Sequence, residues 1–164
     1  MAVMVLAMLF IGIGMVASLA DYHRLVTIHK PLGIAILILV AIRLVNRLVN
    51  PPPPLPASVP AIERLAIQVS VTVLYVLMFA LPLVGWAMLS AADYPIVLFG
   101  SLTLPPVLPH NPALYAVLRT AHSALAFLLF VTFVAHFSGA MMHALILRDG
   151  VFESMASFRV SPLK

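Results

Sequence analysis

Residues Ala121 to Leu147 read AHSALAFLLFVTFVAHFSGAMMHALIL, an apolar run without Asp, Glu, Lys or Arg that holds three histidines, of which His122 and His136 are fourteen positions apart. An ionisable side chain in such a run is unfavourable in a membrane unless it has a partner. Fourteen helical steps of about 100° fall about 40° short of four turns, so both rings face one side of a helix, about 21 Å apart along its axis. That spacing suits two haem groups stacked between helices, each completed by a histidine from another helix.

The composition places the chain in a membrane. Its 164 residues are 63% hydrophobic and 9% charged, and the mean hydropathy is +1.15. These values leave too little polar surface for a soluble domain. The chain has no cysteine, which excludes disulfides, iron–sulfur clusters, thiolate-bound metals and the covalent attachment of haem through C-x-x-C-H. Any haem is therefore bound non-covalently.

The expected fold class is an all-α membrane protein, an antiparallel four-helix transmembrane bundle that forms a single domain over residues 1–164. Four apolar stretches are long enough to cross about 30 Å of hydrocarbon. The expected helices cover about 1–19, 28–49, 65–89 and 118–147, and a short cytoplasmic tail follows at 148–164. A turn at 20–27, a proline-rich linker at 50–60 and a longer loop at 90–117 connect them. The long loop either lies on the membrane surface or caps the bundle.

Lysine and arginine are unevenly distributed between the two expected sides of the membrane. Six stand on the side of the second linker and the C-terminus, and three on the other: Arg43, Arg47, Arg64, Arg148, Arg159 and Lys164 against Arg24, Lys30 and Arg119. The larger number favours a cytoplasmic location of both termini, in the inner membrane of a bacterium. The net charge of +4 is explained by contacts with anionic lipid headgroups, so no nucleic-acid partner is expected.

The histidines are next placed by depth. His29 opens the second helix and His122 opens the fourth, on the periplasmic side and at matching depth, on helices that we expect to be antiparallel, so the two rings can bind one haem iron. His136 lies deeper, and its partner should come from the first or third helix, neither of which has a histidine. His143 is rotated about 20° from His136 and is either solvated or lipid-facing, or a contact for a quinone or a haem propionate. For any one of these residues the alternative is a hydrogen bond to a Ser or a backbone carbonyl of a neighbouring helix.

Two further residues fit a haem site. Arg43 follows His29 by fourteen positions on the same helix face and could neutralise haem propionates, although it could equally be an interface anchor. Gly33 lies one turn after His29 and would leave room for a porphyrin face, although packing between helices explains it as well. Ligation by two imidazoles leaves no open position on the iron and indicates an electron carrier.

Several motifs together resemble the prokaryotic b561-type cytochromes, four-helix membrane proteins that bind two b haems. They are I-H-K-P-L-G at 28–33, R-L-V-N-R at 43–47, A-L-P-L-V-G-W at 80–86, L-F-G at 98–100, and A-H at 121–122 with the second histidine fourteen residues on. The resemblance implies that His29 and His122 bind the periplasmic haem b and that His136 binds the cytoplasmic one.

The sequence departs from the family pattern in two places. The fourth ligand of the family is a histidine in an H-W pair at the start of the first helix, and this sequence begins at Met1 where that pair would end. No positively charged segment precedes the first apolar run, which argues against a signal peptide, and we expect an encoded start further upstream. One haem is therefore expected for the sequence as written, and a second with an extended N-terminus. Gln68 and Val71 stand where members commonly carry two histidines, which weakens a quinone site near the third helix.

The resulting hypothesis is a haem-b membrane cytochrome that carries electrons within or across the membrane and exchanges them with the quinone pool, ubiquinone included. Some relatives oxidise superoxide, and Lys30 and Arg119 could attract an anion near His29 and His122. The alternative is a non-redox or membrane-anchor haem subunit of a larger respiratory complex. Expected partners are membrane lipid and a quinone or a redox partner protein, while a homodimer and enzymatic activity stay open. A transporter is disfavoured, because no acidic residue lies within any span and no repeats are visible.

Overall fold

The computed structural model is built almost entirely of helices and describes residues 1–51, 54–56, 59–98, 100–149 and 151. The helices are α1 (Ala2–Ala17), α2 (Tyr22–Val49), α3 (Ala61–Ala91) and α4 (Pro112–Met141), and α4 continues into the π-helix η1 (Met142–Leu147). Two short strands, β1 (Ile96–Leu98) and β2 (Leu102–Leu104), pair antiparallel between α3 and α4. The all-α class is confirmed. The tail expected at 148–164 lies mostly outside the described residues.

Three of the helical segments are long and apolar enough to cross a membrane. They contain 28 residues in α2, 31 in α3 and 36 in α4 together with η1. The 16 residues of α1 extend over about 24 Å, less than the roughly 30 Å of a hydrocarbon core. The structure therefore supports three membrane-crossing helices and a shorter fourth helix in the bundle.

Helices α2, α3 and α4 extend beyond the apolar stretches that the sequence marks, whereas α1 is slightly shorter than its stretch. The second helix begins at Tyr22 rather than at 28, because the turn needs only a few residues around Ser18 and Asp21, whose side chains bond at 2.8 Å. The fourth begins at Pro112, where the side chain of Asn111 accepts a hydrogen bond from the Leu114 N–H at 3.0 Å. Hydropathy marks the part of a helix that lies in hydrocarbon, whereas its capping groups decide where it ends.

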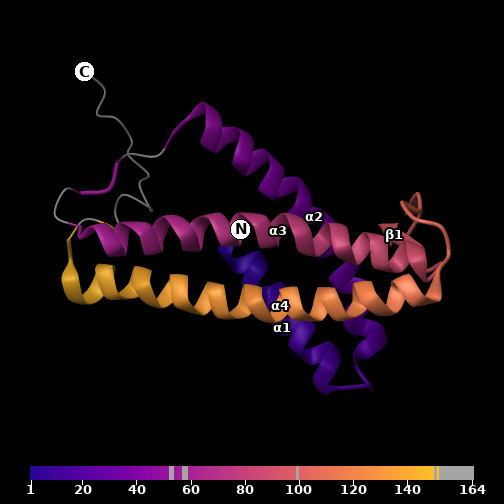
Figure 1. Cartoon of the computed structure of the whole chain (residues 1–164). Helices are drawn as coiled ribbons and strands as arrows, with labels where there is room; N and C mark the ends of the chain where they lie inside the picture. Colours follow the sequence, from indigo (N-terminus) through magenta and orange to yellow (C-terminus); the bar gives the residue numbers. More distant parts are fainter. Residues whose placement is uncertain (52–53, 57–58, 99, 150, 152–164) are drawn as a thin grey trace.

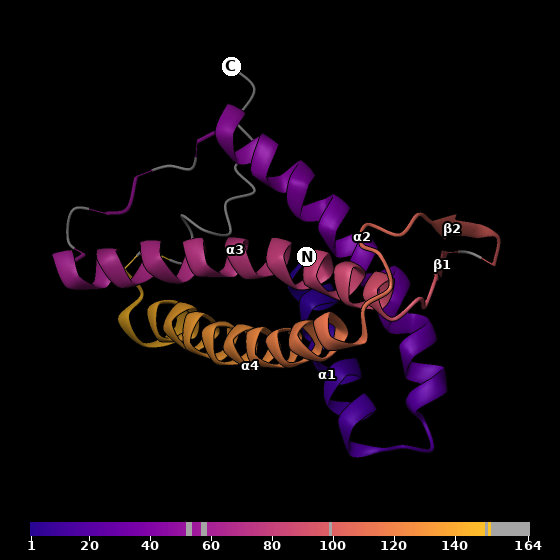
Figure 2. The ribbon, with the colours of Figure 1, turned by 45° about the vertical axis from the view of Figure 1, so that its right-hand side comes forward.

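The packing is dominated by the antiparallel pair α3 and α4. Figures 1 and 2 show these two helices side by side along most of their length, while α1 and α2 form a hairpin that crosses the pair. The buried core joins three helices through Val5 of α1, Leu77 and Leu81 of α3 and Leu129 of α4. This core fixes the short α1 against the long pair.

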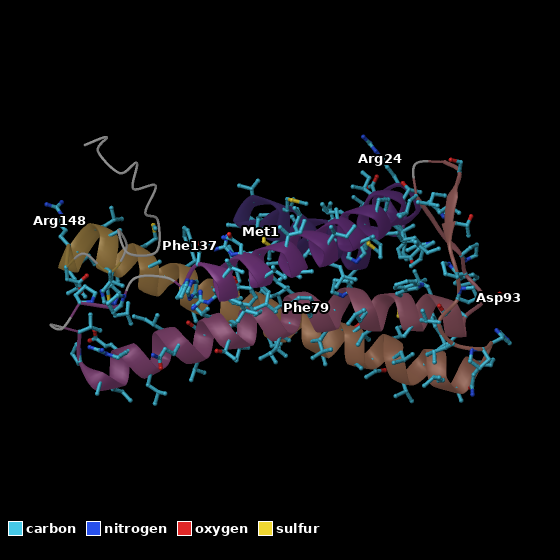
Figure 3. All side chains as sticks on the ribbon, turned by 90° about the horizontal axis from the view of Figure 1, so that it is seen from above. Met1, Arg24, Phe79, Asp93, Phe137 and Arg148 are labelled. Carbon is cyan, nitrogen blue, oxygen red and sulfur yellow. The ribbon has the colours of Figure 1, made fainter. Side chains whose placement is uncertain are left out.

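The two ends of the bundle differ. Arg24 and Asp93 lie at one end, which we call the hairpin end because it carries β1 and β2, and Arg148 lies at the other, the η1 end (Figure 3). Met1 is placed between them. Both α2 and α4 begin at the hairpin end, so they run in the same general direction, and the expectation that these two helices are antiparallel is wrong. The chain order explains this, because the chain reverses its direction once between α2 and α3 and once more between α3 and α4.

The loop between α3 and α4 caps the hairpin end. Ile96 and Leu98 of β1 are buried, and β1 packs against α2. The Trp86 indole N–H donates to the Pro105 carbonyl at 3.0 Å, and the Val107 N–H donates to the Ser90 hydroxyl at 3.1 Å. Of the two positions expected for this loop, the structure shows the cap.

Candidate functional site

His29 and His122 meet at the hairpin end of the bundle. Their ring centroids are 6.3 Å apart and the ring planes are inclined by 70°. The Nδ1 atoms of both rings are buried; among the described residues neither has a side-chain partner, and His122 interacts with the backbone of Leu81 on α3. The expected matching depth is confirmed, and it follows from the shared direction of α2 and α4.

The geometry of this pair fits a metal ion held between two imidazoles. Two imidazoles that bind one ion from opposite sides, each at about 2 Å, have ring centroids about 6 Å apart. Buried polar atoms without partners are unfavourable, and a bound group that uses them removes that penalty. The described part of the chain has no cluster of three or more His, Cys, Asp or Glu. A two-histidine site therefore fits an ion that brings its other ligands with it, as haem iron does.

Gly85 of α3 is a part of this site that sequence reasoning missed. A Cβ atom placed on Gly85 would lie 3.2 Å from Cε1 and 3.5 Å from Nδ1 of His122. The absent side chain thus lets α3 approach the ring. Gly85 is part of the A-L-P-L-V-G-W motif, and a glycine among large apolar residues of a membrane helix is a signal of close approach that could have identified it.

Gly33 lies against α1 in the structure. A Cβ atom placed there would be 3.6 Å from Cε of Met8, an ordinary van der Waals contact. This agrees with the packing explanation of Gly33. Its neighbour is the flexible end of a methionine, a side chain that adapts readily to a changed surface.

His136 is hydrogen-bonded to Ser70 of α3, with Nδ1 3.0 Å from the hydroxyl oxygen. The Ser70 hydroxyl donates its only proton to the Ile67 carbonyl at 2.9 Å, so its oxygen accepts from the Nδ1–H of His136. The proton on Nδ1 leaves the lone pair of the imidazole on Nε2. This bond to a serine is the alternative to haem ligation that the sequence analysis gave for an intramembrane histidine. It also fixes the orientation of the ring, as a hydrogen-bond partner does for a histidine that binds a metal.

His143 is buried at the η1 end and paired with Asp149. Its Nδ1–H donates to Oδ2 of Asp149 at 2.8 Å, and only 5% of the residue is exposed. The expectation of a solvated or lipid-facing ring is therefore wrong. The chain turns back at Arg148, which has a φ of 50° and whose N–H donates to the His143 carbonyl at 2.8 Å. This reversal returns Asp149 to the ring one turn earlier, a contact that hydropathy could not indicate.

The Asp149 carboxyl is held in its charged form. Desolvation raises its pKa, but the hydrogen bonds from His143 and from the Val151 N–H outweigh that effect and leave the pKa below its ordinary value of 3.8. The negative charge is thus stabilised beside the buried imidazole.

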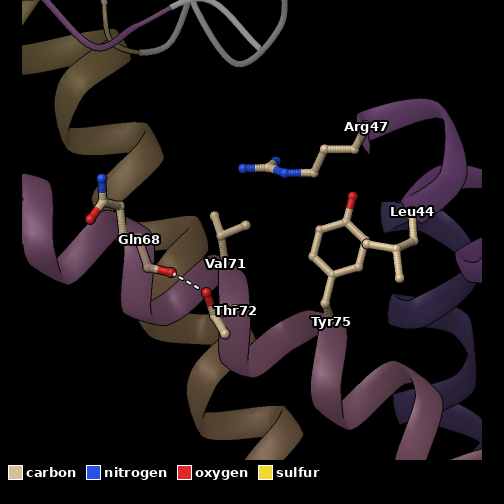
Figure 4. A pocket seen from close by; sticks show the side chains of 6 residues that line it. All are labelled: Leu44, Arg47, Gln68, Val71, Thr72 and Tyr75. Carbon is tan, nitrogen blue, oxygen red and sulfur yellow. Dashed lines mark hydrogen bonds between the residues drawn. The ribbon is translucent and has the colours of Figure 1, made fainter. Parts of the chain in front are cut away.

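Arg43 is exposed and bonds to α3. Its Nε–H donates to the Tyr75 hydroxyl at 3.2 Å. Gln68 and Val71, which stand where the resemblance implies histidines, line a pocket beside this tyrosine (Figure 4). The structure thus places Arg43, His136 and His143 in the half of the bundle toward the η1 end, away from the pair of His29 and His122.

The fold and the site together define a class of protein, a helical membrane protein with a half-buried pair of histidines that meet from two helices. The sequence matches the family described as "Prokaryotic cytochrome b561" over residues 1–158. It is 33% identical over 158 residues to "Cytochrome b561 homolog 2" of Escherichia coli (strain K12), covering 94% of this chain and 84% of that protein. It is 34% identical over 129 residues to "Probable superoxide oxidase CybB" of Yersinia pestis, covering 78% of this chain and 72% of that protein.

The chain belongs to the prokaryotic cytochrome b561 family. Haem b binding and membrane electron transfer follow from membership of this family, as does a place among bacterial membrane proteins. The resemblance carried by the histidine-containing motifs is confirmed.

Filling the space beside His122 should remove the bound haem. We expect Gly85→Leu to displace the His122 ring, because even a Cβ atom at this position would be 3.2 Å from it. Haem content after purification in detergent measures the effect. The matched control is Gly139→Leu on α4, where a Cβ atom has nothing within 4 Å. Equal haem content in the two variants would contradict the role of Gly85.

Acid should lower the stability of the fold at the η1 end, because it protonates the Asp149 carboxylate. Because the folded pKa lies below 3.8, the charged carboxylate stabilises the fold above that pH, and the stabilisation is lost as the pH falls through the lower folded value. Asp149→Asn should therefore be less stable than wild type at neutral pH, and the difference should shrink in acid. Thermal unfolding at a series of pH values measures it. A difference that does not change with pH would argue against the ionic contribution.

Proposed function

We propose that this chain binds one haem b through His29 and His122 and carries electrons within or across the inner membrane, exchanging them with the quinone pool. The observation that supports this proposal is the pair of half-buried rings 6.3 Å apart, whose buried Nδ1 atoms have no side-chain partner among the described residues. In the proposed orientation the η1 end faces the cytoplasm and the hairpin end faces the periplasm, as the distribution of Arg and Lys favours.

The chain's own residues supply binding and shielding. The two rings come from different helices, so ligation would tie α2 to α4, and Gly85 gives the His122 ring its space. The loop over the hairpin end, held by Trp86 and Ser90, limits water at the site. Bound haem would supply a one-electron couple, and two axial imidazoles leave no open position, which favours electron transfer over the activation of oxygen.

The proposal assigns secondary roles toward the η1 end. His136 would serve a second haem through Nε2, with Ser70 orienting its ring. Arg43 would compensate the negative charge of haem propionates through the guanidinium N–H groups that do not bond to Tyr75. His143 would contact a quinone or a haem propionate, and Gly33 stays a prediction for porphyrin clearance.

A second candidate function is the oxidation of superoxide with quinone as the acceptor. Two superoxide ions would each lose one electron to become O2, and the two electrons with two protons would reduce a quinone to a quinol. One similar protein is named a probable superoxide oxidase. Lys30 follows His29 directly, and Arg119 stands three residues before His122, so two cations flank the pair at the hairpin end and would attract a small anion.

The haem-to-protein ratio tests the main proposal. By pyridine haemochrome and a reduced-minus-oxidised spectrum, we expect a ratio near one for the chain as written and near zero for His122→Ala. His23 is an exposed histidine near the start of α2, the helix that carries His29. His23→Ala is therefore the control and should keep the haem. A ratio near two would mean that a further residue pairs with His136, and a chain without haem would contradict the proposal. Reduction of the purified protein by a quinol separates a carrier from a membrane anchor.

The superoxide candidate has its own test. Replacing both cations, as Lys30→Gln with Arg119→Gln, should slow reduction of the bound haem by superoxide several-fold, because attraction of charged reactants raises their rate of encounter. Reduction by a neutral quinol should be unchanged in the same variant. Stopped-flow spectra follow both reactions. An unchanged rate with superoxide would remove this candidate.

A further inference from the structure

A pocket of about 430 Å³ lies between α2 and α3, toward the η1 end. Leu44 and Arg47 of α2 and Gln68, Val71, Thr72 and Tyr75 of α3 line it (Figure 4). Figure 1 shows that α2 diverges from α3 toward its C-terminal end, so the pocket is at the point where the two helices separate. None of the roles proposed above uses it.

The chemistry of the lining favours an anion. The Arg47 guanidinium lies 5.7 Å from the centroid of the Tyr75 ring and reaches over Val71 into the space between the helices (Figure 4). The Tyr75 hydroxyl accepts a hydrogen bond from Arg43 at 3.2 Å, and its own proton stays free to be donated. Within the described residues the one ion pair is between His143 and Asp149. Two guanidinium groups thus stand beside this pocket without a carboxylate to balance them.

The depth of the pocket matches the zone between acyl chains and headgroups. With 31 residues, α3 is about 46 Å long and exceeds a hydrocarbon core of about 30 Å, so its first turns project into the headgroup region. Gln68 is about two turns from the start of α3, and Arg47 is two residues from the end of α2. A charged group at this depth is stable where phosphate groups are within reach.

Exposed apolar residues stand close in sequence to those that line the pocket. On α2 Val45 and Leu48 are 61% and 74% exposed, and on α3 Leu65 and Val69 are 54% and 51% exposed. In a bilayer such side chains contact acyl chains. An anion bound in this pocket would therefore lie among acyl chains, which favours a lipid over a soluble anion.

We propose that this pocket is a specific site for the phosphodiester headgroup of an anionic phospholipid. The Arg47 guanidinium is its main contact, because the planar fork of arginine matches two phosphate oxygens. Tyr75 donates its hydroxyl proton to the same headgroup, and Arg43 positions that hydroxyl. The proposal is separate from the pair of His29 and His122, since its residues lie in the other half of the bundle, and it uses Arg43 only through its bond to Tyr75.

Native mass spectrometry of the purified full chain, exchanged from detergent into nanodiscs of defined lipid, tests the proposal. In nanodiscs that contain both phosphatidylglycerol and phosphatidylcholine, we expect the wild type to retain one phosphatidylglycerol molecule when the protein is released from the nanodisc. Arg47→Gln should retain about fivefold less, the effect of losing one cation near anionic lipid. Arg148→Gln, at the same end of the bundle but outside the pocket, should retain as much as the wild type. Excess inorganic phosphate should not displace the lipid.

Three outcomes would overturn the proposal. Equal retention of the two lipids by the wild type would show that the pocket does not select charge, and this comparison needs no variant. Equal retention by Arg47→Gln and Arg148→Gln would exclude Arg47 as the contact. A loss of haem in Arg47→Gln with unchanged lipid would assign the guanidinium to haem propionates. Tyr75→Phe removes only the hydroxyl and keeps the ring under Arg47. A loss of lipid in this variant therefore measures the hydroxyl's contribution and does not arise from a failure to fold.

Discussion

The structure depends on one constraint, the need of buried imidazole nitrogens for partners in a region that offers no water. His136 meets it with Ser70 and His143 meets it with Asp149. The Nδ1 atoms of His29 and His122 have no side-chain partner within the described chain. The difference separates rings that a side chain of this protein orients from a pair of rings at the spacing that a group bound between them would have, and the family's haem b is such a group.

The arrangement of the helices serves this pair. The antiparallel packing of α3 on α4 supplies a rigid support, while the hairpin of α1 and α2 crosses it and brings His29 to His122 (Figure 2). Because α2 diverges from α3 beyond the crossing, the two ends of the bundle have different characters. One is covered by a loop with buried Ile96 and Leu98, and the other opens between helices beside Arg47 and Tyr75.

Composition and spacing were sufficient to predict a helical membrane protein and the meeting of His29 with His122, because these depend on hydropathy and on depth along a helix, while the family was predicted from the resemblance of its motifs. The contacts of Ser70, Gly85 and Asp149 could not be predicted in the same way. They depend on the rotation of each helix about its own axis and on a chain reversal at Arg148. The helix ends differed from the apolar stretches for a related reason, since capping by residues such as Asn111 is independent of the hydrocarbon thickness.

The loop over the hairpin end also bears on energetics. Ferric haem carries one more positive charge than ferrous haem, and removal of water from around the iron disfavours the more highly charged form. The bond of Trp86 to Pro105 and that of Val107 to Ser90 hold the cover in place at the end where His29 and His122 lie. A haem at that end would therefore have a higher reduction potential than the same haem exposed to water.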